Sequence, residues 1–147
     1  MPKLLITRKM GWNIFIDLDG AVGKRGPNLG DDVLVVSLFL AQIQRSIRSF
    51  GKTPVMPTRA YSAQLQKAID EFQAYIKQRY KPLRLVCDGN VDPIGTASMP
   101  FDRTLGWLHN EMMDQGKTNN TFIQNWPASF FEMASGAVPV PKLYTNF

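Results

Sequence analysis

Few side chains in this sequence have the types and spacing that catalytic chemistry requires. Asp17 and Asp19 stand two apart after an apolar run, in the stretch NIFIDLDGAV. His109 is the only histidine, so multi-histidine metal sites are excluded and one candidate imidazole base remains. Cys87 is the only cysteine, which excludes an intrachain disulfide and a thiolate metal cluster. The first question is whether the two aspartates react or simply end a strand.

The paired aspartates resemble the signature of the haloacid-dehalogenase phosphohydrolases. In that family the first Asp attacks phosphate and the second acts as acid and base around Mg²⁺, which would make the chain a phosphatase. Such a site also needs a Ser or Thr, a Lys and a further acidic pair on an alternating β/α sheet. Past residue 30 the sequence instead predicts long helices and one short strand. We therefore interpret Asp17 and Asp19 as the end of a strand.

His109 is the remaining candidate for acid and base chemistry. Glu111 and Asp114 lie close to it in the sequence, but no nucleophile or metal ligand accompanies them. We expect no catalytic residues, no metal ion and no other cofactor.

Composition describes a soluble globular chain with a basic surplus. A length of 147 residues favours one domain, and a hydrophobic share of 44% is ordinary for globular proteins. The formal charge of +5 attracts polyanions such as nucleic acid, anionic lipid or acidic wall polymers, without choosing among them. We find neither a signal-peptide apolar run nor the roughly 20 apolar residues of a membrane span. We therefore expect a cytoplasmic chain, or export by a phage or contact-dependent secretion route.

The elements that must position these residues are mainly helices, predicted from apolar residues at spacings of 3 and 4. In chain order we expect strands over residues 3–20, a glycine-rich loop over 20–30, helices over about 31–50 and 59–80, a strand over 83–87 and a helix over about 102–115. Asp31 or Asp32 would cap the first helix and Thr58 the second.

Charged side chains almost disappear after residue 117, where Glu132 and Lys142 are the only ones. A short helix is expected over residues 126–134, followed by an extended segment with two prolines that exclude helix. We divide the chain into a single domain over residues 1–116, with its core at about 20–109, and a C-terminal extension over 117–147. The apolar residues of the extension that could dock a protein partner are Phe122, Trp126, Phe130 and Phe131.

Three blocks of the sequence resemble the peptidoglycan-binding-like domains of bacterial wall hydrolases. The first block, VGKRGPNLGDDV at residues 22–33, is similar to the loop VG-x-G-x-N-x-x-x-DV that leads into a helix of that family. The second, KAIDEFQ at residues 67–73, is similar to the A-I-x-x-F-Q part of the family's T-x-x-A-I-x-x-F-Q. The third, CDGNVDPIGT at residues 87–96, is similar to DG-x-VDP-x-G-x-T. The order and the spacing of the three blocks also match.

This resemblance implies a mainly α, three-helix bundle with a short N-terminal β-element and an extended C-terminal tail. It implies a non-catalytic module that binds peptidoglycan peptide or glycan, as in a phage component or a type VI secretion cargo. Phe72 is expected in the core, and Gln73 could bond a loop carbonyl. The residues nearest the family's binding groove are Arg59, Tyr61, Asp88, Asn90, Asp92 and Trp107.

One alternative is a protein-interaction or assembly module that keeps the fold, loses the wall ligand and docks its partner through the C-terminal extension. Two basic clusters could also hold phosphates or acidic glycan stems. One basic helix face consists of Arg45, Arg48 and Lys52, and another cluster consists of Lys77, Arg79, Lys81 and Arg84. Nucleic acid is not an expected partner, because the predicted loops exceed the tight turn of a helix-turn-helix.

Overall fold

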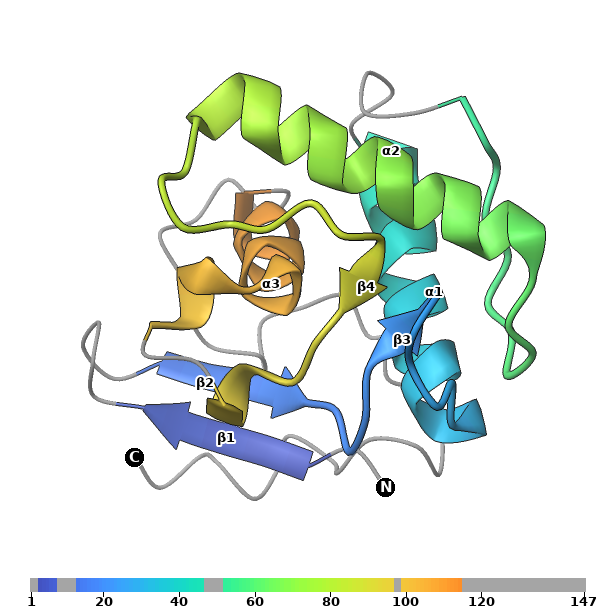
Figure 1. Ribbon diagram of the computed structural model, residues 1–147, viewed down its shortest axis with the longest axis horizontal. Coiled ribbons are helices and arrows are strands. Elements are labelled where there is room, and N and C mark those ends of the chain that lie inside the picture. The colour runs from blue at the N-terminus through green and yellow to red at the C-terminus, as the bar shows by residue number, and fades with distance from the viewer. Residues whose placement is uncertain (1–2, 8–12, 47–51, 97–98, 115–147) are drawn as a thin grey trace.

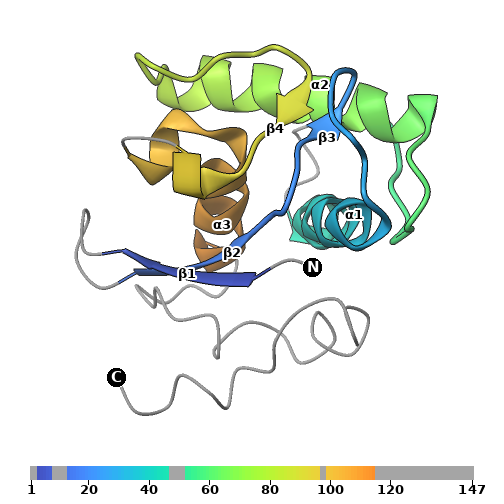
Figure 2. The same cartoon turned by 60° about the horizontal axis from the view of Figure 1, so that its bottom comes forward.

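The computed structural model describes residues 3–7, 13–46, 52–96 and 99–114. Its elements are, in chain order, β1 (Lys3–Thr7), β2 (Asn13–Asp17), β3 (Val22–Gly23), α1 (Gly30–Ser46), α2 (Ala63–Tyr80), β4 (Asn90–Val91), the 3-10 helices η1 (Ile94–Thr96) and η2 (Pro100–Asp102), and α3 (Thr104–Asp114). Helices α1 and α3 lie between α2 on one side and the β1–β2 hairpin on the other (Figures 1 and 2). The expected mainly α architecture is confirmed.

The strands form two small antiparallel pairs. β1 pairs with β2, and Lys3 lies opposite Asp17 in this register. β3 pairs with β4, so that residues almost 70 positions apart in the chain meet at Val22 and Val91. The described part of the chain therefore contains no parallel sheet of the kind that a haloacid-dehalogenase site requires.

Helix α1 is the centre of the core. Its buried apolar residues are Val33, Leu34, Val35, Val36, Leu38, Phe39, Leu40 and Ile43. They occupy nearly every side of the helix rather than a single stripe, because α1 packs against α2, α3 and β3. A helix that is apolar on every side is one that other elements cover on every side.

Within the described residues, no helix has the length and apolar character needed to cross a lipid bilayer.

Helix α2 begins later than the sequence pattern predicts. Its first residue is Ala63, and Ser62 is the N-cap, with an extended backbone and a side chain that accepts a hydrogen bond from the Leu65 amide at 3.1 Å. The predicted cap, Thr58, instead accepts a bond from the Ala60 amide at 3.0 Å. Thr58 therefore closes a turn of the preceding loop, and the prediction of a helix from about residue 59 was wrong by four residues.

The segment after α2 is a loop, and the predicted strand over residues 83–87 is wrong. Strand pairing occurs at β4, a few residues later. Leu85 is buried against the core, whereas its neighbours Leu83 and Val86 face solvent. The segment has strand-like composition but pairs with no strand among the described residues, so it forms no ladder.

Several predictions fall outside the described residues. They concern the end of the first helix after residue 46, the side chains of Arg45 and Arg48, and the whole C-terminal extension over residues 117–147 with its proposed docking residues.

Candidate functional site

Asp17 and Asp19 have separate, structural surroundings. β2 ends at Asp17, as expected, and the Asp17 side chain is only 2% exposed. Its two carboxylate oxygens accept hydrogen bonds from the amides of Ile94 at 2.7 Å and Gly95 at 3.0 Å. Asp19 is exposed, and its backbone amide donates a hydrogen bond to Asp32 Oδ1 at 3.1 Å. Asp17 thus ties η1 to the end of β2 and is shielded from any phosphate.

His109 is part of the core. Its Nε2 accepts a hydrogen bond from the Ile16 amide at 2.8 Å, and its Nδ1 lies 2.7 Å from the Leu105 carbonyl. The carbonyl can only accept, so Nδ1 carries the proton and the ring is neutral. Complete burial lowers the pKa of His109 to about 3. A neutral imidazole with both nitrogens engaged cannot serve as an acid or base for a ligand.

The burial of His109 predicts a loss of stability in mild acid. The pKa of about 3 in the folded chain lies below the ordinary value of 6.5, so the unfolded chain takes up the proton first as the pH falls below about 6.5. Between pH 8 and pH 5 the free energy of unfolding should fall by about 2 kcal/mol, at 1.36 kcal/mol per pKa unit. Urea denaturation at a series of pH values measures this fall.

The matched control for this prediction is His109→Gln, whose side-chain oxygen can still accept from Ile16. That variant should show little change in stability between pH 7 and pH 5. An unaltered pH dependence in His109→Gln would contradict the assignment of the effect to His109.

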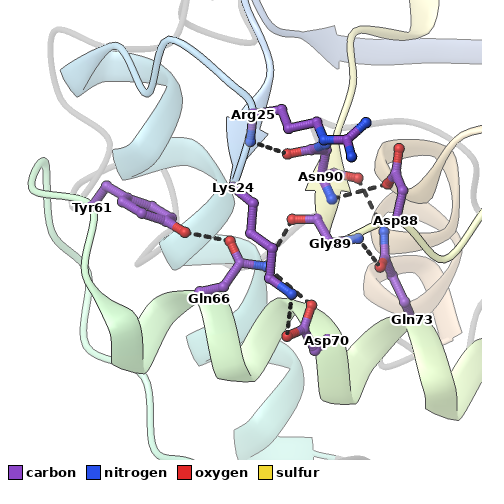
Figure 3. A network of polar contacts seen from close by, with 9 residues as sticks. All are labelled: Lys24, Arg25, Tyr61, Gln66, Asp70, Gln73, Asp88, Gly89 and Asn90. Atoms are coloured by element: carbon purple, nitrogen blue, oxygen red, sulfur yellow. Dashed lines mark hydrogen bonds and ion pairs between the residues drawn. The ribbon is translucent and has the colours of Figure 1, made fainter.

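The three sequence blocks meet in one place, which we call the β3–β4 polar network (Figure 3). Its members come from the turn after β3, from α2 and the loop that precedes it, and from β4 and the turn that precedes it. They are Lys24, Arg25, Tyr61, Gln66, Asp70, Gln73, Asp88, Gly89 and Asn90.

Gln73 is the centre of the network. Its Oε1 accepts a hydrogen bond from the Gly89 amide at 2.9 Å, and its Nε2 donates to the Asn90 carbonyl at 3.0 Å. The same Nε2 donates to Thr104 Oγ1, at the start of α3, at 2.9 Å. Gln73 thus binds a backbone carbonyl, as expected, but that carbonyl belongs to strand β4 rather than to a loop. This one side chain connects α2, β4 and α3.

Two glycines allow the backbones to approach each other in this network. Gly23 has φ +146°, and a Cβ on it would lie 2.2 Å from the Gly89 carbonyl oxygen. Gly89 has φ +80°, a left-handed conformation that favours glycine. Asn28 completes the turn by accepting from the Gly23 amide at 2.8 Å. Close backbone contact thus explains Gly23 and Gly89, and the hydrogen bond to the turn explains Asn28.

The outer rim of the network carries charges of both signs. Lys24, Arg25, Asp70 and Asp88 are exposed. Lys24 Nζ lies 3.8 Å from Asp70, a surface ion pair that contributes little to stability. Tyr61 donates to Gln66, whose Nε2 in turn donates to the Gly89 carbonyl at 2.8 Å. Such a rim can bind a ligand of mixed charge through hydrogen bonds, and it contains no nucleophile paired with a base.

The six residues expected near the groove separate into two sets. Tyr61, Asp88 and Asn90 belong to the network. Asn90 is only 7% exposed, and its Oδ1 accepts from the Arg25 amide at 3.0 Å, so its side chain holds the turn. Asp88 Oδ1 accepts from the Asn90 amide at 3.0 Å. Partial burial, followed by the Asp70 charge, raises the pKa of Tyr61.

The other three residues make their contacts elsewhere. Arg59 Nε lies 3.4 Å from Asp31 at the start of α1. Asp92 pairs with Arg103 at 3.3 Å, and its pKa is raised by partial burial and by the Asp88 charge, against the opposing effect of Arg103.

Trp107 is half-buried near the far end of α2. Its ring stacks on Tyr80, with centroids 4.8 Å apart, and its Nε1 donates to the Phe101 carbonyl at 2.9 Å. Tyr61 precedes α2 and Tyr80 ends it, and a helix of 18 residues spans about 27 Å. Trp107 is therefore not brought together with Tyr61.

Sequence reasoning missed Lys24, Arg25, Gln66 and Asp70. The first two lie inside the glycine block, Gln66 directly precedes the KAIDEFQ block and Asp70 lies inside it. Their position beside matched residues was the available signal. A second feature is a cavity of about 130 Å³ in the loop before α2. Its lining residues are Pro54, Val55, Met56, Thr58, Ser62, Gln64 and Leu65.

Comparisons of the chain with protein-family models, with curated proteins and with solved structures find no match.

Proposed function

We propose that this chain is a non-catalytic binding module of the peptidoglycan-binding-like type, with a peptidoglycan fragment as its ligand. One observation carries the proposal: the three blocks that resemble the family interact directly. Gln73 of the second block binds Gly89 and Asn90 of the third, and the Arg25 amide of the first block donates to Asn90. Residues that match a family motif and also hold one another in place support a shared architecture more strongly than motif matches alone.

The chemistry of the network suits such a ligand. Wall stem peptides carry carboxylates and amino groups on short side chains, and the glycan carries hydroxyls. In the proposal the carboxylates bind Lys24 and Arg25, an amino group binds Asp88, and the Tyr61 ring packs against the sugar or peptide. Gln66, Gln73 and Asn90 act as positioning residues beneath this surface. Trp107, on α3, stacks on Tyr80 at the C-terminal end of α2 and is too far from this surface to touch a small fragment bound there.

A binding assay with insoluble wall material tests the proposal. The double variant Lys24→Gln/Arg25→Gln keeps the backbone bond from residue 25 to Asn90 and removes two surface charges. Its affinity for purified sacculi should fall about tenfold, which corresponds to about 1.4 kcal/mol. Binding by the unaltered chain should weaken only modestly with added salt, because hydrogen bonds and stacking supply most of it.

The matched control is Lys52→Gln/Lys67→Gln, which removes the same charge at two exposed positions outside the network. Its affinity for sacculi should stay within about twofold of the unaltered chain. An equal loss in both double variants, or a collapse of binding as salt rises, would identify simple attraction by net charge. The protein-interaction alternative, which relies on residues 117–147, would then be preferred.

A further inference from the structure

The loop over residues 81–87 exposes apolar side chains that a folded domain normally hides. Leu83 is 99% exposed and Val86 is 65% exposed, while Leu85 between them is buried. The loop leaves the C-terminal end of α2 and runs back along that helix to β4, at the edge of the molecule (Figures 1 and 2). Leu85 anchors the loop, so Leu83 and Val86 are presented to the surroundings.

Four exposed cations flank these apolar side chains. They are Lys77, Arg79, Lys81 and Arg84. Within the described part of the chain, Lys77 and Lys81 have no carboxylate within 4.0 Å, and the Arg84 pair with Asp102 is long at 3.9 Å. Arg79 lies over the Tyr80 ring, 5.4 Å from its centroid. Most of this positive charge is thus available to an external anion.

We propose that the 81–87 loop docks on the surface of an anionic lipid bilayer. Leu83 and Val86 enter the headgroup region, where apolar surface leaves water, and the four cations contact lipid phosphates. Nucleic acid also offers phosphates, but its backbone gives a fully exposed leucine no apolar environment. The combination of exposed aliphatic side chains with four exposed cations in the same stretch of chain therefore favours a lipid surface. This inference does not depend on the wall-binding proposal, because Leu83, Val86 and the four cations are not members of the β3–β4 polar network, although the loop ends beside Asp88.

Co-sedimentation of the full chain with vesicles tests the apolar part of the proposal. The chain should bind vesicles of phosphatidylcholine mixed with phosphatidylglycerol, and should not bind phosphatidylcholine alone. Leu83→Ser should lower the partition coefficient about tenfold, because one aliphatic side chain no longer leaves water. Met56→Ser is the matched control: Met56 is also exposed and lies before α2, and its replacement should change partitioning by less than about twofold.

A second pair of variants tests the cations. Lys77→Gln/Lys81→Gln should lower partitioning about tenfold or more, since each cation near an anionic surface contributes separately. Lys52→Gln/Lys67→Gln removes equal charge elsewhere and should lower partitioning by less than about threefold. Equal losses in the two double variants would overturn the assignment to this loop.

Cys87 permits a direct readout, because it is the only cysteine and is exposed at the end of the loop. An environment-sensitive dye on Cys87 should shift its emission to the blue when phosphatidylglycerol vesicles are added. The same dye on the Cys87→Ser/Met56→Cys variant should show no shift. The proposal is overturned by absence of vesicle binding, by equal binding to phosphatidylcholine alone, or by an unaffected Leu83→Ser variant. It is also overturned if duplex DNA binds the chain as tightly and with no dependence on Leu83.

Discussion

Replacement of Phe72 by alanine is expected to lower the free energy of unfolding by about 3–5 kcal/mol. Phe72 is fully buried in α2, within the apolar cluster that α1 and α3 share. Removal of the ring leaves a cavity between packed helices that can only partly close. A domain of this size has a total stability of about 5–15 kcal/mol, so the variant should be close to unfolded in mild denaturant.

Urea denaturation followed by circular dichroism measures the effect of Phe72→Ala. The matched control on the same helix is Lys77→Ala, at an exposed position, which should change the stability by no more than about 0.5 kcal/mol. Similar losses in the two variants would show that the buried face of α2 has been misidentified.

Replacement of Gln73 by methionine, which has a similar shape, is expected to cost about 2–4 kcal/mol. The change removes three hydrogen bonds and leaves the Gly89 amide and the Asn90 carbonyl without this buried partner. Each buried polar group that loses its bond costs about 1–3 kcal/mol. Because the bonds hold the turn before β4, hydrogen exchange of the Gly89 amide should also become faster.

Gln78→Met on the exposed face of α2 provides the control for Gln73→Met. It makes the same chemical change in solvent and should alter stability by less than about 0.5 kcal/mol. A loss below about 1 kcal/mol in Gln73→Met would contradict the central role of Gln73.

Helices were the most predictable part of this fold, because apolar residues that recur every three or four positions line one face of a helix. The buried position of Phe72 was anticipated and is confirmed, whereas the burial of Gln73 was not predicted. The start of α2 was not, since Thr58 and Ser62 both have the side chain of an N-cap and only the tertiary structure chooses between them. The Thr58 amide donates to Ser37 at 2.9 Å, which holds residue 58 against α1 outside the helix.

Features that depend on distant parts of the chain were less predictable. Residues 83–87 have the composition of a strand, yet the nearest strand partner, β3, pairs with Asn90 and Val91 instead. Asn90 was expected at a ligand surface, but the Arg25 amide holds its side chain in the interior. Exposed charged residues such as Lys24 and Asp70 show no periodicity, so nothing in the local pattern distinguishes a binding rim from ordinary solvated surface.

Titration of the labelled chain with a soluble muropeptide, followed by amide NMR shifts, tests the proposed function most directly. Binding at the β3–β4 polar network predicts shifts at Lys24, Arg25, Tyr61 and residues 88–90, with an affinity no better than the micromolar range, about −8 kcal/mol. The amide signals of residues 81–86 should not shift. Absence of shifts at millimolar ligand, or shifts restricted to Lys77, Arg79 and Lys81, would contradict wall binding at this site.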